Sequence, residues 1–223
     1  MTKVFNEVFD KYDLMNDLMS FGAHRLWKSK LIDWMSPRQN QHLIDVASGT
    51  GDVARAFLKE TNFSGKASCV EPNKNMLKIG EKKLKNLANV KWYCAQAEKL
   101  PFKDETFDIY VVSFGIRNFS NIRLALNESR RVLKTGGRFL CLEFSKVNNE
   151  ILSEFYKKYS KMIPHIGKYI VGKSEPYEYL INSINDFYSQ EELLKLIKSN
   201  GFESVEFRDL SGGIAAIHSG WKI

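Results

Sequence analysis

Apolar side chains recur at helical spacing in the first part of the chain. One face of a helix expected over residues 4–20 carries Val4, Phe5, Val8, Phe9 and Tyr12. A second helix, expected over residues 24–35, carries Leu26, Trp27, Leu31 and Trp34. Pro37 marks the end of this second helix. Both helices precede the first expected strand, so we predict that they form an N-terminal helical extension to the sheet domain that follows.

From residue 42 the pattern changes to short apolar runs separated by helical segments. The runs predict strands at residues 42–47, 66–71, 90–95, 107–115 and 138–145. Helices are expected at residues 51–60, 73–87 and 122–134, the last of them ending at a Gly136–Gly137 turn. Alternation of this kind produces right-handed crossovers and a parallel sheet that helices cover on both faces.

The C-terminal part departs from this alternation. Residues 150–188 have a helical pattern with an interrupted middle, and Ser189 with Glu192 predicts a capping box that opens the next helix. Strands expected at 203–210 and 213–221 follow each other without a helix, so they form an antiparallel hairpin. An α/β sheet that ends in one reversed strand resembles the Rossmann-like class I methyltransferases. The resemblance implies seven strands in the order 3-2-1-4-5-7-6.

We predict a single domain, because the sequence of 223 residues contains no repeat, no low-complexity tract and no linker rich in proline and glycine. Within it we expect an N-terminal helical lid at residues 1–40 and a cofactor-binding half at residues 41–146. Residues 147–223 would supply substrate-facing and membrane-facing helices and the closing hairpin. Each of the three cysteines falls in an expected strand, which predicts buried free thiols at Cys69, Cys94 and Cys141.

The chain carries 33 Lys and Arg against 26 Asp and Glu, a formal charge of +7. This surplus suits an anionic partner such as a phospholipid surface or a nucleic acid, and it equally suits a surface kept basic for solubility. No apolar run is long enough to span a bilayer. The first residues lack the apolar stretch of a signal peptide. Charge alone therefore leaves the partner open.

A glycine-containing motif, DVASGTGD, occupies residues 45–52 between the first strand and the helix that follows it. Its glycines permit a tight turn and a close approach of the backbone to a ligand. The candidate cofactor-binding residues in this motif are Asp45, Ser48, Gly49, Thr50, Gly51 and Asp52. The motif also satisfies the G-x-G-x-x-A pattern of dinucleotide-binding proteins, and a turn without a ligand is the remaining alternative.

Three features favour S-adenosylmethionine over a nicotinamide dinucleotide at this turn. Asp45 and Asp52 would repel a pyrophosphate but suit a cofactor that carries an ammonium and a sulfonium group. The third strand leads into Gln96 and Ala97, where an adenine edge can be read. The sheet also ends in the reversed strand described above. With either cofactor, Glu71 closes the second strand, where a carboxylate can accept hydrogen bonds from both ribose hydroxyls.

The segment SFGIRN, residues 113–118, follows the fourth strand. Ligands of open α/β sheets bind beyond the carboxyl ends of the strands, so this segment should face the reacting methyl group. Arg117 and Asn118 offer N–H groups to a phenolic oxygen or its anion, which makes them candidate catalytic residues. Loop capping and surface pairing are the structural alternative for both side chains.

Two longer segments carry a family resemblance: YDLMNDLMSFGAHRLW at residues 12–27 and RVLKTGGRFLCLEFS at residues 131–145. With DVASGTGD, EPNKNMLKIG, SFGIRN and the closing GIAAIHSGWK, they resemble the ubiquinone/menaquinone biosynthesis C-methyltransferase family over nearly the whole chain. Three positions depart from the family pattern: Thr135 replaces the usual Pro, Glu71 the commoner Asp, and Gln96 the commoner Asn. Each keeps the required chemistry or varies a turn.

The resemblance implies methylation of a ring carbon in a polyprenylated quinol, with S-adenosylmethionine as methyl donor and without a metal. Matching positions imply that the methyl donor is bound by Thr50, Glu71, Gln96, Ala97 and Ser113. Tyr12 and His24 complete the candidate catalytic set, because they lie in the N-terminal helices expected to cover the site. The alternatives are a core position for Tyr12 and a structural role for His24.

Expected partners follow from this substrate class. Residues 151–173 mix apolar and basic side chains, which suits binding in the plane of an anionic membrane surface. An ordinary amphipathic helix packed on the core is the alternative. A quinone-biosynthesis complex and a homodimer are open alternatives, and nucleic acid is not an expected partner. The expected location is the bacterial cytoplasm, peripheral to the inner membrane, or the matrix side of the mitochondrial inner membrane.

Three other functions stay open at this point. A nucleic-acid methyltransferase would usually need an Asn-Pro-Pro-Tyr-like segment or a cysteine nucleophile after the fourth strand, and SFGIRN has neither. A non-catalytic scaffold of a quinone-biosynthesis complex and an NAD-linked oxidoreductase are the other two. Titration with S-adenosylmethionine and with NAD distinguishes both from the methyltransferase.

Overall fold

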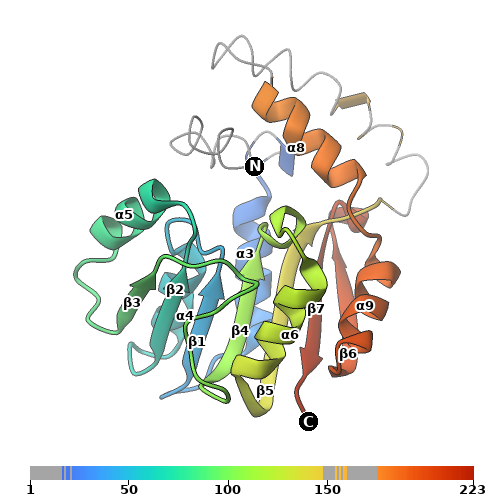
Figure 1. The fold of residues 1–223 in the computed structure, drawn as a ribbon. Helices are drawn as coiled ribbons and strands as arrows, with labels where there is room; N and C mark the ends of the chain where they lie inside the picture. The colour runs from blue at the N-terminus through green and yellow to red at the C-terminus, as the bar shows by residue number, and fades with distance from the viewer. Residues whose placement is uncertain are drawn as a thin grey trace.

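The computed structural model describes residues 17, 19–20, 22–147, 154, 156, 158–159 and 175–223. Its centre is a seven-stranded sheet in the order β3-β2-β1-β4-β5-β7-β6 (Figure 1). The strands are β1 (His42–Val46), β2 (Lys66–Val70), β3 (Val90–Tyr93), β4 (Phe107–Ser113), β5 (Leu133–Phe144), β6 (Glu203–Leu210) and β7 (Ala215–Trp221). Neighbours from β3 to β5 pair in parallel, and β7 is antiparallel to both β5 and β6. The predicted order and the reversed strand are confirmed.

Helices cover both faces of this sheet. They are α3 (His24–Met35), α4 (Asp52–Glu60), α5 (Lys74–Lys83), α6 (Ile122–Val132), α8 (Glu175–Asn185) and α9 (Gln190–Ser199), with the short 3-10 helices η2 (Ile116–Asn118) and η3 (Ser211–Gly213). Helices α3 and α4 pack on one face, and α6 and α9 pack on the other (Figure 1). Helix α5 lies beside the β3 edge, and α8 lies beyond the carboxyl ends of the strands.

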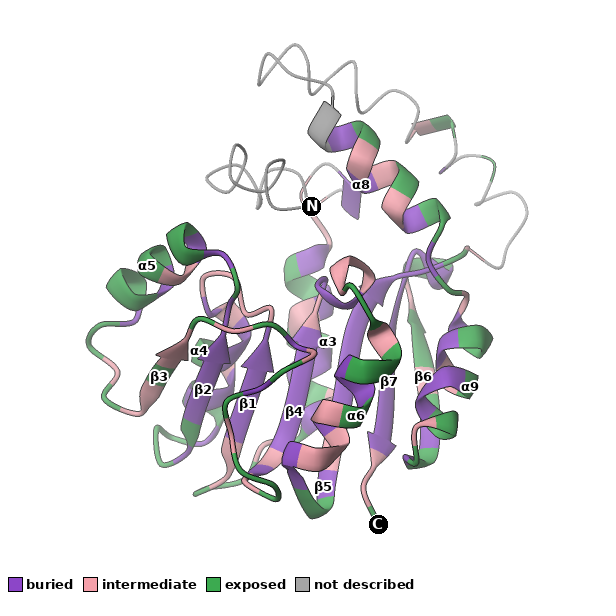
Figure 2. Ribbon diagram, viewed as in Figure 1, coloured by how far each residue is buried: buried purple, intermediate pink, exposed green. Residues whose placement is uncertain are grey.

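The core follows from strict alternation along the central strands. In β4, Ile109 and Val111 join the buried cluster formed with α3 and α4, whereas Tyr110 and Val112 join the cluster formed with α6 and α9. Figure 2 shows the central strands buried along most of their length. Each large apolar side chain buried in this way contributes about 1.5–3 kcal/mol. The two clusters therefore hold the strand ends, where the site lies, in fixed positions.

Local sequence signals set the helix ends. The capping box predicted at Ser189 and Glu192 is present at the start of α9. Two helix ends differ from the prediction. Helix α5 ends at Lys83, and α6 ends at Val132 because Leu133 is already extended and begins β5, a strand that includes the glycine pair expected as a turn.

Some predicted burial is also wrong. Cys94 follows the end of β3 and is exposed, whereas Cys69 and Cys141 are buried free thiols as predicted. Leu26 is 60% exposed although it was placed on the apolar face of its helix. The helix predicted over residues 4–20 lies outside the described residues, apart from residues 17 and 19–20. In the described part of the chain, every helix falls short of the length or hydropathy that a membrane span requires.

Trp92 on β3 packs against two glycines, one within α5 and one directly before α4. A methyl group added to Gly80 of α5 would lie 2.1 Å from an atom of the Trp92 ring. One added to Gly51, directly before α4, would lie 2.8 Å from Leu84 and 3.0 Å from the same ring. Glycine is therefore required at both positions, and the indole links α5 to the turn that precedes α4.

Candidate active site

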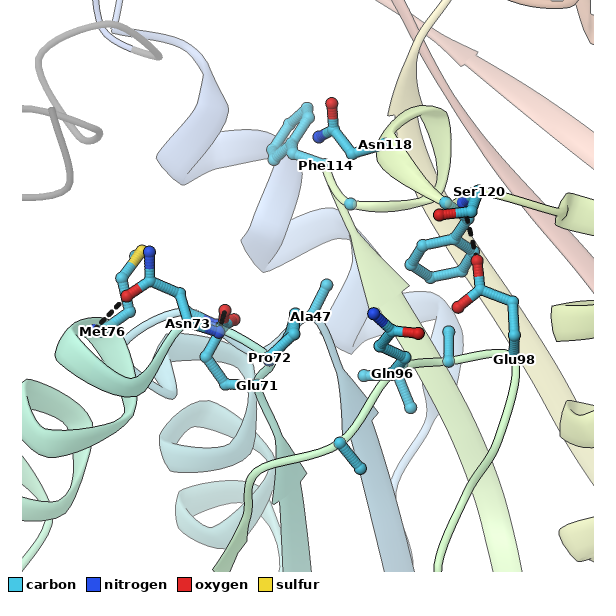
Figure 3. A pocket seen from close by; sticks show the side chains of 16 residues that line it. Ala47, Glu71, Pro72, Asn73, Met76, Gln96, Glu98, Phe114, Asn118 and Ser120 are labelled. Atoms are coloured by element: carbon cyan, nitrogen blue, oxygen red, sulfur yellow. Dashed lines mark hydrogen bonds between the residues drawn. The ribbon is translucent and has the colours of Figure 1, made fainter. Parts of the chain in front are cut away.

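A cavity of about 260 Å³ opens at the carboxyl ends of β1, β2 and β4. Figure 3 shows the side chains that converge on it from the strand ends and from the segment after β3. Its lining residues are Val46, Ala47, Gly49, Glu71, Pro72, Asn73, Met76, Ala95, Gln96, Ala97, Glu98, Phe114, Gly115, Asn118, Phe119 and Ser120. This is where ligands bind in open α/β sheets.

Two turns with left-handed residues meet at the cavity. In the glycine turn, residues 47–51, φ is +53° at Ala47, +57° at Gly49 and +81° at Gly51. Phe114 at the end of β4 has φ +56°. A left-handed conformation costs a non-glycine residue about 1–2 kcal/mol. The turns also touch, because a methyl group on Gly115 would lie only 2.5 Å from the Ala47 Cβ. Strain of this kind concentrates at functional sites.

The Glu71 carboxylate holds the glycine turn against the end of β2. It accepts the N–H of Gly49 and the N–H of Asn73, each at 2.9 Å. Burial raises the pKa of Glu71, and these two N–H groups partly offset that rise. A carboxylate has about four acceptor positions, so two hydrogen bonds from the backbone leave room for ligand hydroxyls. This acceptor capacity fits a ribose.

Asp45 lies beneath the turn and does not line the cavity. Its side chain accepts the N–H of Ala54 at 3.2 Å, and burial raises its pKa to about 7. Ser48 connects the turn to β2 through its own N–H, which donates to the Val70 carbonyl at 3.2 Å. Of the six candidate residues in the motif, Gly49 alone lines the cavity. The other five do not line it, and their predicted contacts with the cofactor stay predictions.

Asp52 forms ion pairs with two lysines. Its carboxylate pairs with Lys28 at 3.2 Å and with Lys83 at 2.6 Å, and Lys83 also donates to the Thr50 hydroxyl at 3.1 Å. Burial would raise the pKa of Asp52, but the two lysines together lower it. The carboxylate is therefore already neutralised by protein cations. Asp52 thus has protein partners, and its predicted contact with the cofactor stays a prediction.

A mixed apolar and polar wall continues the cavity after β3. Ala95 and Ala97 line it together with the exposed Gln96, as the sequence predicted for Gln96 and Ala97. Glu98 accepts the N–H of Ser120 at 2.6 Å and the N–H of Asn121 at 3.1 Å. Small apolar surfaces next to one amide suit a flat heteroaromatic ring. Glu98 in addition joins this wall to the segment that follows β4.

The segment 113–118 forms a corner above the end of β4. Asn118 lines the cavity, as predicted. Ser113 does not line it, although its buried hydroxyl oxygen has no hydrogen-bond partner among the described residues. Arg117 also lies outside the lining, with its side chain only 1% exposed. The guanidinium forms an ion pair with Glu143 and donates to the Phe114 carbonyl at 3.0 Å. Arg117 therefore does not line this cavity, and its predicted role as a donor to the phenolic oxygen stays a prediction.

A model of the ubiE/COQ5 methyltransferase family matches residues 1–222. The chain belongs to this family. A relative in Rickettsia akari (strain Hartford), named ubiquinone/menaquinone biosynthesis C-methyltransferase UbiE, is 50% identical over 230 residues, covering 100% of this chain and 92% of the relative. A relative of the same name in Ruegeria sp. (strain TM1040) is 48% identical over 224 residues, covering 99% and 89%.

Solved structures share the fold at low sequence identity. A SAM-dependent methyltransferase from Aquifex aeolicus matches with a TM-score of 0.65 at 16% identity, covering 88% of this chain and 89% of that one. The [4+2]-cyclase SpnF matches with a TM-score of 0.66 at 18% identity, covering 90% and 81%. The fold is thus compatible with more than one reaction. Family membership confirms the predicted enzyme class and S-adenosylmethionine as the cofactor of this methyltransferase.

His24 of the methyltransferase is buried on α3 and does not line the cavity. Its Nε2 lies 2.9 Å from a carboxylate oxygen of Asp17, and burial lowers its pKa. These contacts support the structural interpretation of His24 rather than a role as base. Tyr12 lies outside the described residues, so its placement and the lid function stay predictions.

Sequence reasoning did not assign several residues that form the methyltransferase site. Glu143 was missed because a carboxylate inside an apolar strand gives no signal of its partner, Arg117. Asn73, which lines the cavity, follows Glu71 closely and also caps α5 through its side chain. An asparagine that caps a helix shortly after a strand end was a sequence signal by which this position could have been found. In the described residues no cluster of three or more His, Cys, Asp or Glu side chains is arranged to hold a metal.

Proposed function

We propose that this enzyme transfers a methyl group from S-adenosylmethionine to a ring carbon of a polyprenyl benzoquinol or a demethylmenaquinol. The substrate class comes from the relatives, which carry that activity in their names and align over nearly the whole chain. The observation that carries the proposal is the cavity itself. It brings an acceptor carboxylate, Glu71, and a hydrogen-bonding amide, Asn118, to opposite parts of one lining.

The residues of the chain divide the work between them. When bound, S-adenosylmethionine supplies an electrophilic methyl group on a positively charged sulfur. Glu71 would accept hydrogen bonds from the ribose, and Gln96 and Ala97 would contact the adenine. Asn118 would donate to the phenolic oxygen and stabilise the negative charge that makes the ring carbon nucleophilic. Orientation of the two reactants supplies about 7–11 kcal/mol at the upper end.

Contact with an anionic membrane is a further part of the proposal, because a polyprenyl tail is dissolved in the bilayer. Of residues 151–173, the structure describes Glu154, Tyr156, Lys158 and Tyr159. Tyr156 is buried and donates to the Met19 carbonyl at 3.0 Å, so this side chain packs on the protein. The exposed Lys158 is available to lipid headgroups. Flotation with anionic and neutral vesicles tests the contact, and equal binding to both contradicts it.

The deciding experiment is an assay with a labelled methyl group. Purified protein is mixed with labelled S-adenosylmethionine and with a short-chain benzoquinol or naphthoquinol analogue. We expect label on a ring carbon of at least one quinol. Calorimetric titration with S-adenosylmethionine accompanies it, because a scaffold need not bind the methyl donor. Binding without transfer to either quinol contradicts the proposed substrate, and absence of binding contradicts the methyltransferase activity itself.

A further inference from the structure

Tyr179 reaches the 113–118 corner from a distant part of the chain. Its hydroxyl donates to the Oδ1 of Asn118 at 3.1 Å, across 61 positions of sequence. The side chain is half-buried, and helix α8, which carries it, packs against η2. The contact therefore joins a helix beyond the strand ends to the amide that lines the cavity.

Helix α8 is held in place by the face opposite to Tyr179. Tyr177, Leu180 and Ile184 are 0%, 4% and 6% exposed and belong to the buried cluster formed with α3 and α4. Their spacing of three and four places them on one helical face. Packing against the core therefore anchors helix α8 and fixes the position of the Tyr179 hydroxyl.

A primary amide has two orientations of nearly equal shape, and only hydrogen bonds distinguish them. The phenol donates a hydrogen bond more readily than it accepts one, so the Tyr179 hydroxyl favours the orientation with Oδ1 toward α8. The Nδ2 group with its two N–H bonds then lies on the other side of the amide. Figure 3 shows the Asn118 oxygen turned away from Glu71 and Gln96 and the nitrogen on the Phe114 side.

We propose that Tyr179 is a positioning residue, which orients the Asn118 amide so that its N–H groups face the phenolic oxygen of the bound quinol. The inference rests on the proposed function, because that function supplies the oxygen to be recognised. Without the hydroxyl, the amide samples both orientations, and one of them presents a carbonyl oxygen to a developing phenolate. Repulsion between the carbonyl oxygen and the phenolate would then slow methyl transfer, whereas the affinity for the methyl donor would not change.

The test compares four proteins: wild type, Tyr179→Phe, Asn118→Ala and the double variant. One neutral hydrogen bond corresponds to about 0.5–1.5 kcal/mol, so we expect Tyr179→Phe to lower kcat about 3- to 10-fold. Affinity for S-adenosylmethionine and the melting temperature should stay unchanged. In the Asn118→Ala background the Tyr179→Phe change should have no further effect on kcat. Tyr188→Phe is the matched control, because Tyr188 is 40% exposed beyond the end of the same helix.

Two results overturn the inference. The first is a kcat of Tyr179→Phe equal to that of wild type. The second is a decrease in kcat on Tyr179→Phe that is equally large in the wild-type and the Asn118→Ala backgrounds. A measurement independent of turnover separates the inference from the proposed function. The side-chain amide resonance of Asn118, assigned by its loss in Asn118→Ala, should shift in Tyr179→Phe and not in Tyr188→Phe. If wild type methylates neither quinol, the proposed function fails, and an unchanged resonance then overturns the positioning role as well.

Discussion

The two walls of the cavity are held by different kinds of contact. On the wall expected to bind the methyl donor, the Glu71 and Glu98 carboxylates each accept two backbone N–H groups. In the 113–118 corner, the decisive contacts join one side chain to another: Arg117 to Glu143 and Asn118 to Tyr179. The first wall depends on the course of the backbone, and the corner depends on particular pairs of residues.

This difference has an energetic consequence. Every residue except proline offers a backbone N–H, so a carboxylate at the end of a parallel strand finds partners wherever the next turn passes close by. A buried pair of side chains is specific, and losing one member leaves the other without its charge partner. Changes in the corner should therefore disturb stability more, and changes in the methyl-donor wall should disturb ligand affinity more.

The largest effect is expected from Arg117→Ala, which leaves the buried Glu143 carboxylate unpaired. Burial already raises the pKa of Glu143, and Arg117 opposes that rise. We expect the free energy of unfolding to fall by about 3–5 kcal/mol, measured by chemical denaturation. The double change Arg117→Met and Glu143→Leu should recover most of that loss. Lys30→Ala, which removes an exposed pair with Asp33, should cost at most about 1 kcal/mol.

That experiment also decides between two roles for Arg117. If the Arg117→Ala protein is as stable as wild type and yet loses turnover, the arginine acts on the substrate and the contrast between the walls is false. If stability and turnover fall together and the apolar double variant recovers stability, Arg117 holds the corner in shape.

A smaller effect is expected on the opposite wall, from Glu71→Gln. A neutral amide loses charge-assisted hydrogen bonds of about 1.5–3 kcal/mol each. The dissociation constant of S-adenosylmethionine should therefore rise about 100-fold, measured by calorimetry. Glu98→Gln is the matched control, because Glu98 also accepts two backbone N–H groups beside the same cavity. Equal losses in the two variants would mean that Glu71 acts only by fixing its turn.

The smallest effect concerns the buried Asp45. Its pKa is about 7 in the folded protein, whereas a carboxyl in an unfolded chain loses its proton near pH 4. The folded state therefore binds the extra proton between these values, and stability falls as the pH rises toward 7. Relative to Asp45→Asn, wild type should lose about 2 kcal/mol of unfolding free energy between pH 5.5 and pH 8. Parallel pH curves for the two proteins would contradict this assignment.

The sequence predicts most of the fold because the signals that specify it are local. The short apolar run that predicts β4 and the capping box at Ser189 depend on neighbouring residues, and both elements appear in the structure. The end of α6 was misplaced, since the choice between one more helical turn and an early β5 is made by pairing with β4.

Within the site, Glu71, Gln96 and Asn118 could be predicted because each directly follows a strand end or an associated turn. The ion-pair partners of Arg117 and Asp52 could not be predicted from sequence position alone. Both are charged side chains whose direction is fixed by partners elsewhere, Glu143 for one and two lysines for the other. A motif identifies which residues stand near a ligand but not which of them the protein itself has already neutralised.

The indole of Trp92 limits how this site can be redesigned. The ring packs against Gly51 at the end of the glycine turn and against Gly80 of α5, so the turn cannot move toward α5 without displacing the indole. Trimming the indole would create the space that the glycines themselves cannot give, since they have no side chain left to remove. A smaller side chain at position 92 is therefore the change that we expect to give the glycine turn room to move toward α5.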